Sequence, residues 1–340
     1  MTTTAAGSGQ VTLGDRTVHR VGFGGMKLSG PRFLGPPADR EAALAVLRRA
    51  VELGVTHVDT SGLYGPHIVN DLIREALHPY PEDLVIVTRV GARRTAEGGW
   101  EEALAPDGLR RSVEEECAHL GLDALHVANL RMPGLGEPAE RSLAEPFEAL
   151  AQLQQEGLVR GLGVSHITSR QVAEARSIAP LACVQNHYNL IHRTDDDLVA
   201  ELAREGIAYT ALEGVSYTSF FPMGEMEPAQ SEVLGAVAQR VGASPLQVAM
   251  AWLLARSPNV LLIPGATTVA ELEQALAAAE VVLGPAKIEE LDRIEGLGGP
   301  PPRRRGAVGA RAAGLRGAVG TRAAGLRVAG GREAGRRPDR

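Results

Sequence analysis

The stretch LVIVTRV (84–90) contains five apolar residues out of seven, and four of those five are β-branched. A short run of this kind predicts a strand that is buried on both faces, as in a parallel sheet covered by helices. Arg89 near its C-terminal end is unusual, because a guanidinium stays protonated and is costly to bury without a partner. A fold that contains this strand must therefore supply Arg89 with a compensating group.

The same apolar pattern recurs along residues 20–297, where short apolar runs alternate with charged amphipathic stretches. Eight strands are expected, at residues 21–24, 56–60, 84–90, 124–131, 161–166, 182–189, 207–212 and 260–266. Apolar residues at helical spacing mark helices at residues 39–54, 68–78, 106–121, 142–157, 168–179, 195–206, 244–257 and 268–281.

Eight such units over about 270 residues predict an α/β fold of the (β/α)₈ TIM-barrel type. A doubly wound sheet would also alternate strands and helices. Its first turn would normally carry G-x-G-x-x-G, and GFGGMKLSG (22–30) does not have that spacing. The segment GDRTVH (14–19) is expected to form a hairpin that closes the bottom of the barrel.

The composition limits the class of protein. The apolar fraction is 44%, no apolar run approaches the ~18 residues of a membrane span, and MTTTAAGSGQ (1–10) lacks the features of a secretory signal. Cys117 and Cys183 lie far apart and have no metal-ligand spacing around them. We therefore expect a reduced, cytoplasmic protein without a metal site or a membrane partner.

The C-terminal segment differs from the rest of the chain. Residues 299–340 contain eleven arginines and two acidic residues, a charge of +9, so the total of −6 leaves −15 on residues 1–298. The unit GAVGARAAGLR (306–316) recurs with one change at 317–327, and its glycines disfavour a packed core. The expected organisation is a flexible N-terminus (1–10), a barrel (11–297) and a disordered Gly/Ala/Arg-rich tail (298–340).

An arginine-rich arm that contacts RNA, DNA or anionic lipid is the alternative for this tail. No aromatic residues interleave with its arginines, which disfavours nucleic-acid binding. The acidic remainder of the chain is also a poor match for a polyanion.

Polar residues collect where the predicted strands end, which is where TIM barrels carry their chemistry. They are Asp59, Tyr64, Arg89, Asn129, Ser165, His166, Gln185 and Tyr209, with PGATT (264–268) after the last strand. Each is weak evidence alone, since a loop tyrosine or a strand asparagine is usually only packed. Their convergence on one rim is the stronger signal.

Several of these segments together resemble the aldo-keto reductases. The matching segments are HVDTSGLYG (57–65), TRVG (88–91), GLGVSH (161–166), VQNHYNL (184–190) and IPGATT (263–268). The resemblance covers roughly residues 10–297 and is closest to a bacterial branch with pyridoxal reductase-like proteins, which has NLR (129–131) on its fourth strand. It implies an NAD(P)H-dependent oxidoreductase that reduces an aldehyde or ketone to an alcohol, or catalyses the reverse.

The resemblance implies four catalytic residues, Asp59, Tyr64, Arg89 and Asn129. Tyr64 would be the proton donor, and a neighbouring cation favours the phenolate. Arg89 stands where the family has a lysine. Asp59 would pair with it, and would therefore be the compensating group that Arg89 requires. Asn129 replaces a histidine, so it can donate to a substrate oxygen but cannot titrate near neutral pH.

The implied cofactor is NADPH, with NADH not excluded. The expected cofactor-binding residues are Gly25, Met26, Ser165, His166, Gln185, Tyr209, Ala211, Leu212, Pro264, Gly265, Ala266, Thr267 and Thr268. Among them, Ser165 and Gln185 would bind the nicotinamide carboxamide, and Tyr209 would stack on the ring. Thr268 and Ala275 stand where the family often has a basic residue and an asparagine.

Two functional hypotheses follow from these residues. The first is an active reductase of a small carbonyl or alcohol substrate, because Asp59, Tyr64 and a cation are all present. The second is a protein on the same scaffold with non-redox chemistry or only a binding role, because Arg89 and Asn129 depart from the family. The loop 213–227, rich in aromatic residues, is expected to line the substrate pocket, although it could simply pack on the barrel top.

Overall fold

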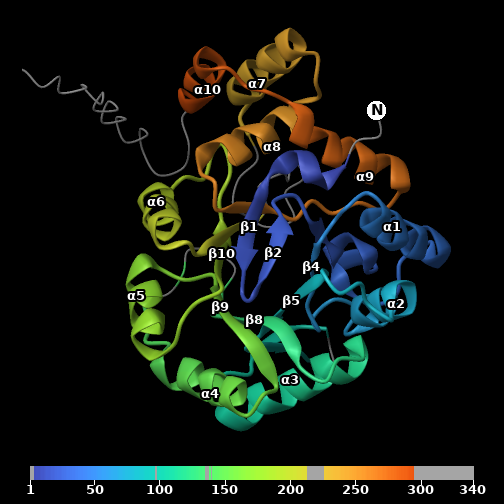
Figure 1. The fold of residues 1–340 in the computed structure, drawn as a ribbon, viewed down its shortest axis with the longest axis vertical. Coiled ribbons are helices and arrows are strands. Elements are labelled where there is room, and N and C mark those ends of the chain that lie inside the picture. The colour runs from blue at the N-terminus through green and yellow to red at the C-terminus, as the bar shows by residue number, and fades with distance from the viewer. Residues whose placement is uncertain (1–3, 96–97, 135–137, 139, 213–225, 295–340) are drawn as a thin grey trace, which may run out of the picture. The chain divides into compact units, whose positions relative to one another are not determined.

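The computed structural model of the 340-residue chain describes residues 4–95, 98–134, 138, 140–212 and 226–294. Its main feature is a parallel sheet of eight strands (Figure 1). In spatial order these are β3 (Phe23–Gly24), β4 (His57–Asp59), β5 (Val85–Val90), β8 (Leu125–Arg131), β9 (Val159–Ser165), β10 (Cys183–His187), β11 (Ala208–Leu212) and β12 (Val260–Leu262). The Gly22 amide donates to the Leu262 carbonyl at 2.8 Å and the Gly24 amide to the Pro264 carbonyl at 3.0 Å, which joins the first strand to the last. The predicted (β/α)₈ barrel is confirmed.

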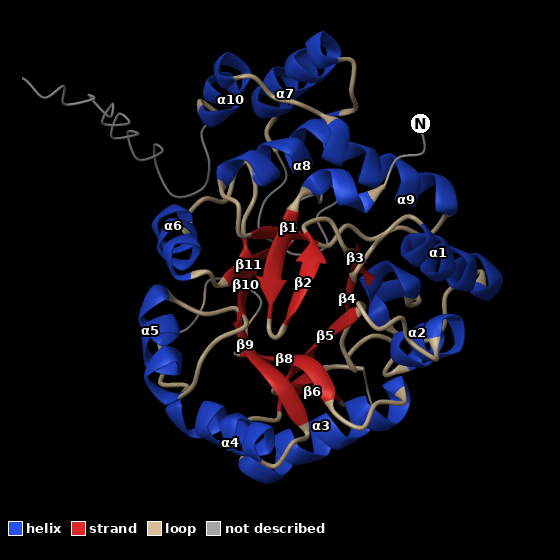
Figure 2. Ribbon diagram, viewed as in Figure 1, coloured by secondary structure: helices blue, strands red, loops and turns tan. Residues whose placement is uncertain are grey.

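Helices surround the strands, as Figure 2 shows. They are α1 (Arg40–Glu52), α2 (Ile68–Leu77), α3 (Pro106–Leu120), α4 (Ala144–Gln155), α5 (Ser169–Ile178), α6 (Asp196–Glu205), α7 (Pro228–Val241), α8 (Pro245–Arg256), α9 (Val269–Leu276) and α10 (Pro285–Asp292). All eight helices expected from periodicity are present, whereas α7 and α10 were not expected. Short 3₁₀ turns are η1 (Ala5–Ser8), η2 (Gly25–Leu28), η3 (Pro31–Phe33) and η4 (Ala277–Glu280).

Local sequence explains where several helices begin and end. The Asp39 carboxylate accepts from the Ala42 amide at the start of α1, and Thr168 forms a capping box with Gln171 at the start of α5. Gly121 and Gly206 end α3 and α6 with φ of 66° and 73°, a conformation that glycine adopts without strain.

The barrel has two distinct apolar layers. The larger one lies between the strands and the helices, where Phe147 and Trp252 are fully buried. The smaller one fills the barrel interior, and its members are Leu13, Val18, Val85, Val87, Val127, Cys183, Ala208 and Leu261. Two of these, Leu13 and Val18, come from the antiparallel hairpin of β1 (Gln10–Leu13) and β2 (Arg16–His19). The expected bottom hairpin is therefore confirmed, and in Figure 2 it lies across the centre of the ring of strands.

Ala5 and Ser8 of η1, within the segment expected to be a flexible N-terminus, are buried. The expected tail (298–340) lies outside the described residues. Within the described part of the chain, no helix is long and apolar enough to cross a membrane.

His57 on β4 gives a prediction for the pH dependence of stability. Its side chain is fully buried, and burial lowers its pKa from 6.5 to about 4. Since the folded-state pKa lies below the ordinary value, the unfolded chain binds the extra proton first as the pH falls. The stabilisation is complete above about pH 6.5, is lost towards pH 4, and amounts to about 3 kcal/mol. Urea unfolding at several pH values should therefore show a shallower decline for His57→Gln than for the wild type, and equal slopes would contradict the assignment.

Candidate active site

Four of the polar residues expected at the barrel mouth lie at or near the C-terminal ends of their strands, as predicted. Asp59 ends β4, Arg89 is the next-to-last residue of β5, Asn129 lies near the end of β8, and Ser165 ends β9. In the sheet register, Arg89 is directly opposite Asn129, which is directly opposite Gly163. Side chains two residues apart on a strand share one face, so these groups project into the barrel interior above its apolar filling.

The charge of Arg89 is compensated by Asp59, the partner expected from the sequence. Nη2 of Arg89 lies 2.8 Å from Oδ1 of Asp59, and both side chains are buried. Gln185 completes the pair, because its Nε2 donates to Oδ2 of Asp59 at 2.8 Å and its Oε1 accepts from Nη1 of Arg89 at 3.3 Å. Burial raises the pKa of Asp59, and the Arg89 charge opposes that rise. The pair is therefore a closed, hydrogen-bonded unit rather than an isolated charge in the core.

The same guanidinium reaches the hydroxyl of Tyr64. Nη2 of Arg89 donates to the Tyr64 hydroxyl and also to the Thr60 carbonyl, at 3.2 Å in the second case. The Tyr64 side chain is 6% exposed, and its ring packs beside Phe33 with the centroids 6.0 Å apart. Burial acts to lower the pKa of Arg89, but the charges of Asp59 and Tyr64 outweigh it and the pKa is raised. A permanent cation is thus fixed against a phenol oxygen at the barrel mouth.

Glu116 on α3 holds the turn that carries Tyr64, a role that the sequence analysis missed. Its buried carboxylate accepts from Nδ2 of Asn70 at 2.8 Å and from the Thr88 hydroxyl at 2.7 Å, while the Thr60 hydroxyl donates to Asn70 at 2.7 Å. A Cβ added at Gly62 would lie 2.2 Å from Oε1 of Glu116, so the turn passes directly over the carboxylate. The available signal was a glutamate within the apolar face of an amphipathic helix.

Asn129 differs from its expected role. Its side chain is fully buried, with Nδ2 donating to Gln185 at 3.4 Å and Oδ1 accepting from the Cys183 thiol at 3.2 Å. A Cβ at Gly163 would lie 1.9 Å from Oδ1 of Asn129, so the glycine provides the space for this side chain. The second N–H of Nδ2 is also enclosed, because the side chain is fully buried, so the predicted donation to a substrate oxygen is not available in this arrangement.

Gln185 also departs from its expected role. Both atoms of its amide are used by Asp59, Arg89 and Asn129, and its side chain is fully buried. The physical reason is the length of Arg89, whose second nitrogen reaches the glutamine. A contact with a cofactor carboxamide would have to use the second N–H of Nε2, and that side chain is fully buried.

Ser165 and His166 retain unused polar atoms at the mouth. Within the described residues, neither the buried Ser165 hydroxyl nor Nε2 of His166 has a hydrogen-bond partner. Buried polar groups are normally paired, so an orphaned hydroxyl indicates a missing partner. Burial lowers the pKa of His166 to about 3, with Arg131 and His187 adding to the effect, so its ring is neutral. Both atoms suit a carboxamide, which can donate and accept hydrogen bonds.

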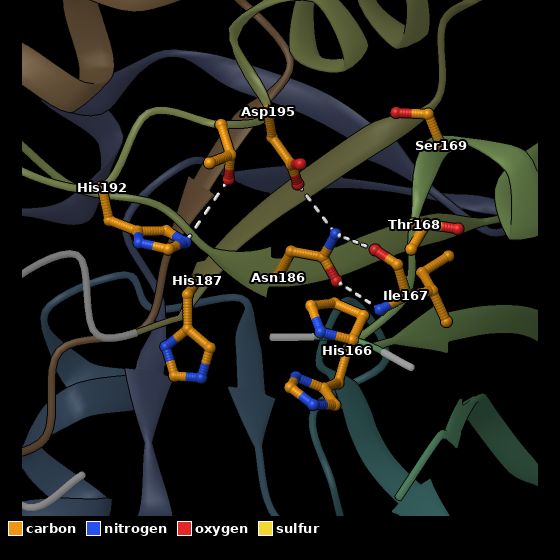
Figure 3. Close-up of a pocket in the computed structure, with 10 residues that line it drawn as sticks. His166, Ile167, Thr168, Ser169, Asn186, His187, His192 and Asp195 are labelled. Carbon is orange, nitrogen blue, oxygen red and sulfur yellow. Dashed lines mark hydrogen bonds between the residues drawn. The ribbon is translucent and has the colours of Figure 1, made fainter. Parts of the chain in front are cut away.

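A cavity of about 200 Å³ adjoins His166 between the loops that follow β9 and β10. Figure 3 shows the residues that line it, with Asn186 between Asp195 and the backbone of Ile167. Nδ2 of Asn186 donates to Asp195 at 2.7 Å and to the Ile167 carbonyl at 2.8 Å. Asp195 is the N-cap residue of α6, but its side chain forms no capping bond and instead holds the rim together.

Tyr209 and Ala211 were expected to contact the cofactor, and their side chains face away from the mouth. In register, Thr210 lies opposite the inward-facing Gln185, so Tyr209 and Ala211 point to the helix layer. The Tyr209 hydroxyl donates to Asp195 at 2.8 Å, and its ring packs edge-on against Tyr188. The expected stacking of Tyr209 on a nicotinamide ring is therefore wrong for this chain.

The segment after β12 reaches the same rim. Thr268 caps α9 by accepting from the Glu271 amide at 3.2 Å, while the Thr267 amide donates to the Glu271 carboxylate at 2.8 Å. Lys27 packs near Gly265, since a Cβ at that glycine would lie 3.2 Å from the lysine side chain. Gly25 and Met26 begin η2 at the end of β3, and Leu212 ends β11, so the remaining expected cofactor residues also lie at the mouth. The aromatic part of the loop 213–227 falls in residues 213–225, outside the described residues.

The described ranges of the chain contain no group of three or more His, Cys, Asp or Glu side chains that could hold a metal ion. The fold and the site together define a class: a TIM barrel with a tyrosine, a cation and a carboxylate in contact at the C-terminal mouth, next to unused amide-binding atoms. Comparison with known proteins identifies the family. The sequence profile of the Aldo/keto reductase family matches residues 20–295, and the chain belongs to that family, whose members are oxidoreductases that use nicotinamide cofactors.

Relatives are similar over nearly their whole length. Pyridoxine 4-dehydrogenase of Escherichia coli (strain K12) is 50% identical over 289 residues, which cover 84% of this chain and 98% of that protein. An uncharacterized oxidoreductase of Schizosaccharomyces pombe is 33% identical over 289 residues, covering 85% of this chain and 90% of that protein. The first of these agrees with the predicted likeness to a pyridoxal reductase-like branch.

Solved structures show the same fold. A thermostable aldo-keto reductase in complex with the inhibitor epalrestat matches with a TM-score of 0.71 at 28% identity, covering 84% of this chain and 99% of the other. An aldo/keto reductase from Klebsiella pneumoniae, in complex with NADP and acetate, matches with a TM-score of 0.70 at 24% identity, covering 87% and 96%. At 24% identity, the match to the Klebsiella pneumoniae protein shows a common fold and nothing more.

Proposed function

We propose that this protein reduces an aldehyde or ketone to an alcohol, or catalyses the reverse, with Tyr64 as the proton donor. The observation that carries the proposal is the contact of the Arg89 guanidinium with both the Tyr64 hydroxyl and Asp59. A fixed cation stabilises the phenolate that remains after the proton leaves. Tyr64 must then take a proton back before the next turnover.

The residues at the mouth fit a nicotinamide cofactor. When bound, the cofactor supplies the hydride that the carbonyl carbon receives. The orphaned Ser165 hydroxyl and Nε2 of His166 would hold the carboxamide, and Lys27 with the segment 264–268 would hold the phosphate-bearing part. NADPH is the expected cofactor. The Thr267 amide already donates to the Glu271 carboxylate, so it is not free to bind a phosphate of the cofactor. Binding of NADH should therefore be measured together with binding of NADPH.

Arg89 in place of a lysine has a specific consequence. The guanidinium keeps a positive charge on the Tyr64 oxygen, but it also binds Gln185 and cannot take part in a proton relay. Asp59 and Gln185 fix its orientation, so the charge needs little rearrangement when the phenolate forms. The family assignment favours this reductase over the non-redox alternative.

Cofactor titration followed by turnover tests the proposal. Protein fluorescence should report binding of NADPH or NADH with a Kd of about micromolar order, and aldehydes including pyridoxal should then be reduced with loss of cofactor absorbance. Ser165→Ala is the matched variant: it should weaken cofactor binding severalfold while raising the Tm of the cofactor-free protein, because it removes a buried unpaired hydroxyl. Absence of binding by both cofactors at micromolar concentration would end the proposal.

A further inference from the structure

Arg131 is a second guanidinium at the barrel mouth, and the proposed reaction does not use it. It is the last residue of β8, two positions beyond Asn129, and lies directly opposite Ser165 in the sheet register. One pleat repeat places it about 6.6 Å further toward the opening than Asn129, on the same inward face. Arg131 therefore lies above the layer that contains Arg89 and beside the expected carboxamide site.

No carboxylate in the described part of the chain compensates Arg131. Among the described residues, no acidic side chain forms an ion pair with it, and its hydrogen bonds go to two carbonyls of its own loop, Met132 at 2.9 Å and Gly134 at 3.0 Å. Burial lowers its pKa to about 10, and the Arg89 charge adds to the effect. The bond to Gly134 is solvent-exposed, so an edge of the guanidinium is accessible.

Arg94 shows what a purely structural arginine looks like at this mouth. Its Nε, Nη1 and Nη2 atoms each donate to a backbone carbonyl, and its guanidinium lies 4.8 Å from the Trp100 ring centroid. These bonds tie together β6 (Ala92–Arg94), the hairpin that it forms with β7 (Trp100–Glu102), and the Tyr64 turn. Arg131 uses two of its five N–H groups, so it retains donors for a ligand.

The surroundings of Arg131 do not neutralise it. His166 is neutral and touches the same loop, since a Cβ at Gly134 would lie 3.3 Å from its Nε2. Asp195 in the adjoining cavity is held by Asn186 and Tyr209, as Figure 3 shows for Asn186. Arg89 is close enough for its charge to act on Arg131. Among the residues that the structure describes, the positive charge on this side of the mouth is therefore uncompensated.

The phosphate-bearing part of the cofactor is not the expected partner of Arg131. The segment 264–268 follows β12, and the strand order places β11, β10 and β9 between β12 and β8. β8 is thus four strands away from β12 in a closed barrel of eight, so Arg131 and the segment 264–268 lie on opposite sides of the mouth. Arg131 instead lies beside Ser165, on the strand whose Asn129 is opposite Arg89, and Arg89 contacts Tyr64. It is therefore on the side where the carbonyl substrate would meet Tyr64.

We infer that Arg131 binds an oxyanion, a carboxylate or phosphate, carried by the carbonyl substrate. The inference rests on the proposed reductase function and names its substrate class. The planar fork of an arginine matches the two oxygens of such groups, and a partly buried guanidinium gains strongly from a counter-charge. Acidic aldehydes and ketones are therefore preferred over their neutral analogues.

Matched substrates test the inference in the full-length protein. The pairs are 4-formylbenzoate with its methyl ester, and D-glyceraldehyde 3-phosphate with D-glyceraldehyde. The wild type should give a higher kcat/KM for the anionic member of at least one pair, by about tenfold or more, and the pair that shows it distinguishes carboxylate from phosphate. Arg131→Gln should reduce that ratio at least tenfold, and Arg131→Lys should preserve part of it.

Arg93→Gln is the control, because Arg93 lies on the same rim, is exposed and already pairs with Glu101 at 2.6 Å. It should keep the wild-type ratio. Equal turnover of both members of both pairs would overturn the inference, as would an Arg131→Gln variant that keeps the ratio or one whose cofactor KM alone changes. If no aldehyde is turned over, the proposed function fails; calorimetric binding of 4-formylbenzoate against its ester, in wild type and Arg131→Gln, then decides the role of Arg131 by itself.

Discussion

Replacing Tyr64 by phenylalanine should lower kcat for carbonyl reduction by about 10²- to 10⁴-fold, the usual contribution of a positioned proton donor. The change removes the hydroxyl that accepts from Arg89 and leaves the ring that packs beside Phe33. The carbonyl oxygen would then lack its donor while the fold is retained. Steady-state kinetics with a reactive aldehyde and saturating cofactor measure the effect.

Tyr80→Phe is the matched control for this experiment. Tyr80 is half-buried and donates its hydroxyl to the Leu120 carbonyl at 2.6 Å, away from the mouth. Its loss should cost stability and leave kcat near the wild-type value. The cofactor Kd should be similar in all three proteins. A Tyr64→Phe enzyme with more than a tenth of the wild-type kcat would show that the proton comes from another group.

Breaking the buried pair of Asp59 and Arg89 from one side should reduce the free energy of unfolding by about 3–5 kcal/mol, because the remaining charge loses its counter-charge. Asp59→Leu should be the more damaging change, since a guanidinium cannot shed its proton. Arg89→Met should be milder, because the remaining carboxyl can become neutral. The double variant should recover most of the loss, as an apolar replacement of both partners removes the unpaired charge. Urea unfolding of the four proteins gives the comparison.

The pH dependence separates the two single variants. Burial already raises the pKa of Asp59 against the opposing charge of Arg89, so removing Arg89 raises that pKa further. A group whose folded-state pKa is raised contributes most below its unfolded value near 4, and the contribution is lost as the pH rises. The deficit of Arg89→Met should therefore grow between pH 5 and pH 8, whereas that of Asp59→Leu should not. Parallel curves for the two variants would show that Asp59 does not take up the proton.

Periodicity in the sequence predicted the barrel because each strand and helix carries its own signal. LVIVTRV (84–90) predicted the bounds of β5 to within one residue, and the apolar spacing in 39–54 predicted α1. The pattern did not reveal α7, although Glu227 and Gln230 form a capping box at its start. An extra helix packed outside the eight repeating units breaks the regular alternation on which the prediction depended.

The site was only partly predictable. The contact of Asp59 and Arg89 was expected and is present. Gln185 and Asn129 were assigned to cofactor and substrate, and the structure has them bound to one another and to the ion pair. Family roles assume the lengths of the usual side chains. A longer Arg89 and a shorter Asn129 together rearrange which hydrogen bonds can form.

The sequence by itself determined the fold class, the family and the rim on which the chemistry lies, because strand order and strand ends follow from local patterns along the chain. The tertiary structure alone decided which way the side chains face and which polar groups are already paired. It turned Tyr209 toward Asp195, placed Glu116 under the Tyr64 turn, and, within the described ranges, left Arg131 without a carboxylate. Such pairings depend on distances between strands that are far apart in sequence, and no spacing along the chain encodes those distances.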